Sequence, residues 1–96
     1  MLIKIDEEAM ASVSSQVRVI ADEIIDLKSK MDNLINGSLP EAWVGVGYEK
    51  YQERYETEKQ NFDNMYSLVS EIGEAVVKAS NEYAQNDVAV GNAFAK

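Results

Sequence analysis

The sequence predicts an all-α protein: an antiparallel helix-turn-helix hairpin that dimerises into an elongated four-helix bundle. Apolar residues recur at alternating spacings of three and four along two long segments, and no segment shows the alternation typical of a strand. The helix-breaking residues gather between these segments, because the only proline and three of the five glycines lie within residues 36–50. A chain of 96 residues makes one domain, which we place over 1–96.

The first arm is predicted to be a helix over about 6–36. Asp6 is placed to act as the N-cap, and two acidic residues follow it where the positive end of the helix dipole lies. Asn36-Gly37 is typical of a helix end, with Gly37 free to adopt the left-handed conformation. A stripe with a mean period of 3.5, typical of left-handed coiled coils, runs along the arm: Met10, Val13, Val17, Ile20, Ile24, Leu27, Met31 and Leu34.

The second arm is predicted to be a helix over about 47–86, followed by a flexible tail over 87–96. Glu58 is the one charged residue in its stripe. It has two interpretations: a position that fixes register or binds a partner, or a helix-edge position that reaches water. The stripe consists of Tyr48, Tyr51, Tyr55, Glu58, Phe62, Met65, Val69, Ile72, Val76, Ala79 and Tyr83.

Each arm also carries apolar residues beside its stripe, such as Ile25 on the first and Val77 on the second. The apolar surface is therefore wider than one partner helix can cover, and a two-helix hairpin has little interior. We expect a second hairpin to cover the remainder. The predicted core of the hairpin and dimer comprises Val13, Val17, Ile20, Ile24, Leu27, Met31, Leu34, Tyr51, Tyr55, Phe62, Met65, Val69, Ile72 and Val76.

The connection between the arms is predicted over about 37–47. Ser38 and Glu41 have the spacing of a capping box, in which each side chain bonds a backbone N–H near the start of a helix. Pro40 lies within the same first turn, where its missing N–H costs little. A short turn of helix is therefore expected to begin at Ser38.

Two glycines then oppose a continuous helix. Gly45 and Gly47 each disfavour the helix by about 1 kcal/mol relative to alanine. We expect the chain to bend at Trp43-Val44-Gly45 and the second helix to begin between Gly45 and Tyr48. Trp43 has two compatible interpretations: it plugs the end of the hairpin, or it displays a surface that another protein reads.

Composition excludes several classes of function. The chain has no cysteine and no histidine, which removes disulfides, zinc sites and the commonest general base. Its net charge of −8 disfavours nucleic acid and anionic membranes. No apolar run approaches the roughly 20 residues of a membrane span, and the N-terminus does not read as a cleavable signal peptide. We expect no enzyme activity, no cofactor and no metal site.

The Trp-x-Gly triplet gains weight from its surroundings. The chain has about 100 residues and two helical arms, and Trp43-Val44-Gly45 lies at the hinge, followed by Gly47 and Tyr51. In these features it resembles the WXG100 family, also called ESAT-6-like proteins, over its whole length. The family often has alanine at the place of Gly47 and phenylalanine at that of Tyr51. The resemblance implies a small helical hairpin, exported by a type VII secretion system of Gram-positive bacteria or mycobacteria, that forms homodimers or heterodimers.

A second family motif is Tyr-x-x-x-Asp/Glu near the C-terminus, which reads Tyr83-Ala-Gln-Asn-Asp87 in this chain. Positions i and i+4 share a helix face, so the ring and carboxylate can be read together. The alternative is a last stripe tyrosine beside a solvated aspartate. By resemblance, Trp43 and Gly45 shape one half of a bipartite export signal, and Tyr83 and Asp87 the other.

These observations favour a non-enzymatic secreted protein. It would be exported as a folded dimer with itself or a related WXG100-type protein, recognised by an FtsK/SpoIIIE-type ATPase. It would act as secretion cargo, virulence-associated factor or co-secretion partner, cytoplasmic before export and extracellular afterwards. The alternative is a cytosolic helical adaptor or chaperone that pairs with a larger toxin or partner carrying a similar hairpin.

Overall fold

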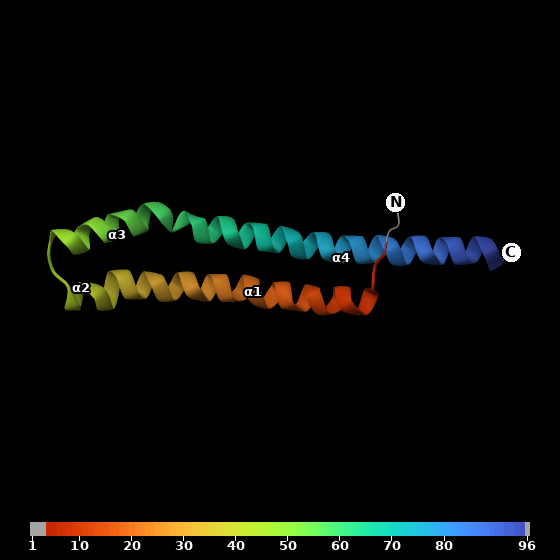
Figure 1. Ribbon diagram of the computed structural model, residues 1–96, viewed down its shortest axis with the longest axis horizontal. Coiled ribbons are helices and arrows are strands. Elements are labelled where there is room, and N and C mark those ends of the chain that lie inside the picture. The colour runs from red at the N-terminus through yellow and green to blue at the C-terminus, as the bar shows by residue number, and fades with distance from the viewer. Residues whose placement is uncertain (1–3, 96) are drawn as a thin grey trace.

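The computed structural model describes residues 4–95, with side chains over 4–83. Two helical arms run antiparallel and form a rod measuring 77 × 20 × 15 Å (Figure 1). No strand occurs in the described range, so the predicted all-α hairpin is confirmed. The elements in chain order are α1 (Glu7–Asn33), a π-helix η1 (Leu34–Ser38), α2 (Leu39–Ala42), α3 (Val46–Glu58) and α4 (Gln60–Ala95).

The first arm begins at the predicted cap and continues past its predicted end. The Asp6 carboxylate accepts a hydrogen bond from the Ala9 backbone N–H at 3.0 Å, which confirms the N-cap. The prediction that Asn36-Gly37 stops the helix is wrong, because helical backbone continues through η1 and α2 to Ala42. Gly37 does not adopt a positive φ; among the described residues, only Gly45 does.

The π-helix leaves one carbonyl without a partner inside the arm. The Leu39 backbone N–H donates to the Leu34 carbonyl, five residues back, so the usual donor for Ile35 is used elsewhere. In the π-helical pattern the next donor for Ile35 would be residue 40, a proline that has no N–H. The Tyr48 hydroxyl, from the second arm, donates to the Ile35 carbonyl at 2.6 Å instead. The second arm thus completes the hydrogen bonding of the first.

The predicted capping box is also wrong. Ser38 stands at the N-cap of α2, but its backbone is helical and its side chain makes no capping hydrogen bond. A cap is not needed there, because η1 runs directly into α2 and supplies carbonyl partners. Pro40 lies in the first turn of α2, as its missing N–H permits.

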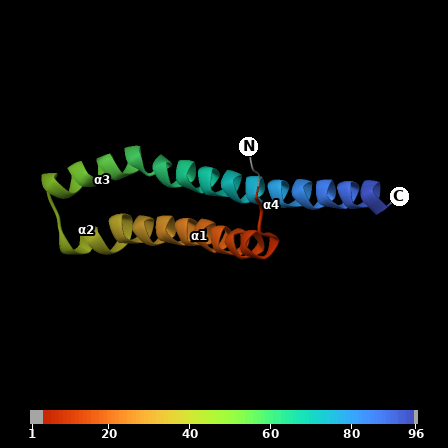
Figure 2. The same ribbon diagram turned by 45° about the vertical axis from the view of Figure 1, so that its right-hand side comes forward.

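The second arm is divided at Lys59, whereas the sequence predicts one continuous helix. The Phe62 backbone N–H bonds the Lys59 carbonyl at 3.0 Å, a tighter three-residue turn, and the arm bends between α3 and α4 (Figure 2). The break directly follows Glu58, the charged residue in the stripe. Glu58 is exposed and accepts a hydrogen bond from Arg54 at 3.3 Å, which supports its interpretation as a helix-edge residue.

The C-terminal turns of α4 extend beyond the first turn of α1, as both views show. The backbone is helical to Ala95, beyond the end near residue 86 that the sequence suggests. Flexibility of 87–96 stays a prediction, and Lys96 lies outside the described residues. Among the helices described, none combines the length and apolar character required to cross a membrane.

Candidate functional site

The stripe of side chains between the two arms keeps every second position of the predicted stripe and is displaced by one residue at the positions between them. The stripe positions Val17, Ile24 and Met31 are half-buried as expected, but Ala21 is the one buried apolar residue among those described. The first-arm residues that face the second arm include small and polar ones: Ser14, Val17, Ala21, Ile24, Lys28, Met31 and Ile35. On the second arm they include Gln52, Tyr55, Lys59, Phe62, Val69, Gly73, Val76 and Ser80.

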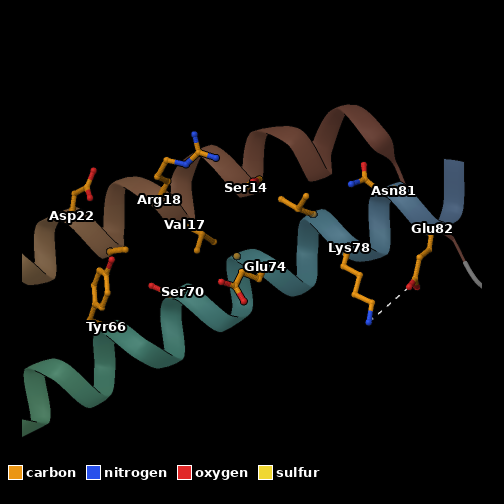
Figure 3. Close-up of a pocket in the computed structure, with 13 residues that line it drawn as sticks. Ser14, Val17, Arg18, Asp22, Tyr66, Ser70, Glu74, Lys78, Asn81 and Glu82 are labelled. Carbon is orange, nitrogen blue, oxygen red and sulfur yellow. Dashed lines mark ion pairs between the residues drawn. The ribbon is translucent and has the colours of Figure 1, made fainter. Parts of the chain in front are cut away.

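Small residues explain why this register is preferred near the open end of the hairpin. A β-carbon built on Gly73 would stand 3.1 Å from Val17 Cγ1, tighter than ordinary van der Waals contact. Val17 points from α1 toward α4 at this place (Figure 3). Ala21 and Gly73 therefore let the two helices approach closely, which larger stripe residues would prevent.

The displacement leaves a continuous row of large apolar side chains in solvent. We call this row the exposed stripe; its members are between 41% and 56% exposed. It borders a groove of about 620 Å³ on the turn half of the hairpin. These residues are not part of the core of the single hairpin, which corrects that part of the prediction; their burial in a dimer stays a prediction. The exposed stripe comprises Val13, Ile20, Leu27, Leu34, Tyr51, Met65 and Ile72.

Polar contacts join the arms in the half of the hairpin nearer the turn. Lys28 Nζ lies 2.9 Å from Asp63 Oδ1, and the Tyr55 hydroxyl donates to Asp32. The Asn36 side chain accepts from Gln52 at 3.0 Å and donates to Glu56 at 3.3 Å. A hydrogen bond between the arms forms only where a donor and an acceptor lie at the same level along the helix axes. These contacts therefore fix the register of one arm against the other.

The electrostatic consequences are clearest at Tyr55. Partial burial and the hydrogen bond to Asp32 raise the pKa of the Tyr55 hydroxyl to about 12. Hydrogen bonds from Lys59 and Asn36 lower the pKa of Glu56, and the same Glu56 contact raises the pKa of Lys59. These shifts arise from contacts that hold the hairpin together, and not from a catalytic arrangement.

At the turn, Trp43 is neither fully buried nor fully displayed. Its side chain is 39% exposed, and its ring packs against Tyr48 at 6.3 Å and Tyr51 at 6.0 Å between centroids. A β-carbon built on Gly47 would stand 2.7 Å from Trp43 Cζ2, so the indole rests on the glycine. Gly45 has φ 138° and ψ −177°, a conformation that is essentially restricted to glycine.

The proposed C-terminal signal lies far from the turn of the same chain. Tyr83 is half-buried and belongs to α4, whose C-terminal turns lie at the end of the rod away from α2 and α3 (Figure 1). The side chain of Asp87 falls outside the described residues, although its backbone belongs to α4. The hairpin therefore does not bring Trp43 and Gly45 together with Tyr83 and Asp87 within one copy.

A second groove, which we call the small-residue groove, lies toward the open end of the hairpin and has a volume of about 550 Å³. Val17, Ala21 and Gly73 are among its apolar lining, and Tyr66 reaches from α4 toward α1 (Figure 3). An ion pair of 4.0 Å joins Lys78 and Glu82 at its rim. The described acidic side chains form no cluster that could hold a metal ion.

Comparison with known families gives one match. The model of the family described as WXG100, proteins of 100 residues with WXG, matches residues 2–88. The chain therefore belongs to the WXG100 family. This is a family of small, non-enzymatic helical hairpins secreted by type VII systems, whose members generally pair with each other as dimers. Comparisons with curated proteins and with solved structures return no match.

The sequence reasoning missed three features of the site. It did not single out Val44 and Val46, which are the most exposed large apolar side chains described, or the hydroxyl of Tyr48, which bonds the first arm. The pattern of two valines around an essential glycine was visible in the sequence. The role of Tyr48 was not, because it depends on the π-helix in the other arm.

Proposed function

We propose that this protein is cargo of a type VII (ESX/Ess-like) secretion system, exported as a folded homodimer and recognised by an FtsK/SpoIIIE-type ATPase. Membership of the WXG100 family supports the secretion class. The observation that carries the dimer is the exposed stripe, because a monomer would leave this row of large apolar side chains in water. In this proposal the protein acts by binding, as secretion cargo or as a co-secretion partner.

The face that carries the exposed stripe is large enough for a dimer interface. The rod is 77 Å long and 20 Å wide, and a face of that size exceeds the roughly 800 Å² that each partner contributes to a standard interface. The seam within one hairpin includes small and polar residues beside its larger ones, whereas the stripe consists of large side chains such as Leu27, Tyr51 and Met65. Burial of such side chains contributes roughly 1.5–3 kcal/mol each, so a second copy would gain most by packing on this face.

The positions of the two motifs favour an antiparallel arrangement of the copies. Trp43 and Gly45 belong to the connection between α2 and α3 at one end of the rod, and the C-terminal turns of α4, the helix that contains Tyr83, lie at the other end (Figure 1). Two hairpins packed in opposite directions would set the turn of one copy beside the C-terminal turns of α4 of the other. A bipartite export signal would then be complete only in the dimer, so that the ATPase recognises the assembled protein.

The proposal is tested by comparing culture supernatant with lysate in the producing strain and in the same strain lacking the export ATPase. Wild-type protein is expected in the supernatant of the first strain alone. Tyr83→Ala and Asp87→Ala should abolish export, whereas Asn81→Ala, a substitution at an exposed position on the same helix, should not. Circular dichroism and light scattering on each purified variant establish that fold and dimer mass are unchanged.

The outcomes separate the proposal from its alternative. Retention of the wild-type protein in the lysate of both strains would indicate the cytosolic adaptor, as would a stable complex with a larger helical partner. Export of both Tyr83→Ala and Asp87→Ala at the wild-type level would remove those residues from the signal. A monomeric mass at micromolar concentration would overturn the homodimer.

A further inference from the structure

Two valines at the turn are far more exposed than any other large apolar side chain described. Val44 is 87% exposed and Val46 is 80% exposed, while Trp43 between the arms is 39% exposed. They stand on either side of Gly45. We call Val44, Gly45 and Val46 the turn tip. The most prominent apolar surface at this end of the molecule is therefore formed by the valines and not by the tryptophan.

The turn tip is held in one shape by its surroundings. The Trp43 backbone N–H donates to the Leu39 carbonyl at 2.8 Å, which ends α2, and the Gly45 carbonyl accepts from the Glu49 N–H at 3.2 Å, which begins α3. Below the tip, the Trp43 ring packs on Tyr48. These contacts fix the backbone on both sides of Gly45, so the two valine side chains project from a backbone that is held in one conformation.

The fold itself does not require valine at these positions. Turns favour glycine, asparagine, aspartate and serine, which either reach unusual backbone conformations or bond the backbone locally. Val44 lies outside the helices, between α2 and α3, and Val46 is the first residue of α3. Two β-branched apolar side chains in water gain nothing for the hairpin, and burying each against a partner would contribute roughly 1.5 kcal/mol.

We propose that Val44 and Val46 form the contact surface of the turn for the export ATPase, with the tryptophan as their support. This inference rests on the function proposed above and assigns its binding surface. Glu41 and Glu49 are exposed on either side of the tip, in a chain of net charge −8. The matching surface is an apolar cleft on a protein, bordered by basic side chains. Acidic flanks disfavour an anionic membrane as the target.

The test measures direct binding of the purified full-length dimer to the purified cytosolic domains of the ATPase by titration calorimetry. The variants are Val44→Ser, Val46→Ser and the double substitution. Val19→Ser is the matched control, because Val19 is an exposed valine on the outer side of α1. Each serine at the tip is expected to weaken binding roughly ten-fold and to reduce export in parallel, with the melting temperature and dimer mass unchanged. Val19→Ser should bind as the wild type does.

Each other outcome overturns a distinct statement. If the wild type binds and the tip variants bind equally well, the assignment of the valines is wrong and the proposed function stands. If the wild type is exported without the ATPase, the proposed function itself is wrong. Loss of dimer mass in the tip variants would place the valines in the dimer interface instead. If the tip variants lose binding to anionic lipid vesicles but still bind the ATPase, the partner of the turn tip is a membrane surface and not a cleft on a protein.

Discussion

The indole ring of Trp43 rests directly on Gly47, at a distance that leaves no room for a β-carbon. A β-carbon at Gly47 would stand 2.7 Å from Trp43 Cζ2, where atoms of real side chains are not found. The ring is held from its other sides by Tyr48 and Tyr51. The small residue at position 47 thus determines how deeply the tryptophan sits, in a position where the family often has alanine.

Replacing Gly47 by alanine is expected to displace the Trp43 ring. In an open helical position, glycine-to-alanine stabilises a protein by about 0.5–1 kcal/mol, and Gly37→Ala should show this gain because nothing lies near its added methyl group. Gly47→Ala should lose that gain and shift the tryptophan fluorescence to longer wavelength. Trp43 is the only tryptophan, so the signal is specific. Equal stabilisation by the two variants with unchanged fluorescence would contradict the prediction.

Removing the Tyr48 hydroxyl is expected to destabilise the π-helix of the first arm. In Tyr48→Phe the Ile35 carbonyl loses its donor, and Pro40 provides no substitute. The expected cost is about 1 kcal/mol in the free energy of unfolding, measured by urea denaturation. Tyr66→Phe, at an exposed tyrosine of the small-residue groove, is the control and should change stability little. Hydrogen exchange should become faster at residues 34–39 in Tyr48→Phe; uniform exchange across the variant would argue against this local role.

Stability should fall at high pH partly because of Tyr55. Its pKa is about 12 in the folded protein, above the ordinary value of 10.0, so the folded state holds the proton more tightly. The associated stability is complete below pH 10 and is lost as the pH rises from 10 to 12. The free energy of unfolding of the wild type should therefore decline more steeply over that interval than that of Tyr55→Phe.

Comparison with Tyr55→Phe is needed because Lys30 and Lys59, whose pKa values are raised from 10.5, also lose their protons at high pH. Both proteins carry those lysines, so the difference between their unfolding curves isolates the tyrosine. Denaturation is measured at one protein concentration, since dimerisation links stability to concentration. Parallel declines of the two proteins from pH 10 to 12 would show that folding does not raise the pKa of Tyr55.

The face used for dimerisation can be tested with two neighbouring residues. Ile20 belongs to the exposed stripe, whereas Val19 is exposed on another side of α1. Ile20→Gln should raise the dissociation constant of the dimer at least about ten-fold, because each copy loses a buried isoleucine. Val19→Gln should leave the constant nearly unchanged. Sedimentation equilibrium measures both, and equal effects would show that the stripe is not the interface.

Much of the fold was predictable because it depends on local patterns. The spacing of apolar residues indicated two helices, Asp6 indicated where the first begins, and Pro40 indicated a short helical turn. The errors came from rules that tertiary contacts override. Asn36-Gly37 has the composition of a helix end, yet the arm continues because the Tyr48 hydroxyl supplies the hydrogen bond that the π-helix lacks. A rule based on neighbouring residues cannot predict a hydrogen-bond donor that lies thirteen residues away in the sequence.

The sequence by itself determined that the chain is a helical hairpin with an apolar stripe too wide for two helices, and that the turn lies at Trp43-Val44-Gly45. The tertiary structure decided how that stripe is divided. The predicted register and the observed register both place apolar residues between the arms, so periodicity alone cannot choose between them. Close approach at Ala21 and Gly73, and the ion pair of Lys28 with Asp63, select the register that leaves the exposed stripe outside. Packing and hydrogen bonding between the arms depend on how the two distant segments are aligned along the helix axes. Only the folded chain fixes that alignment.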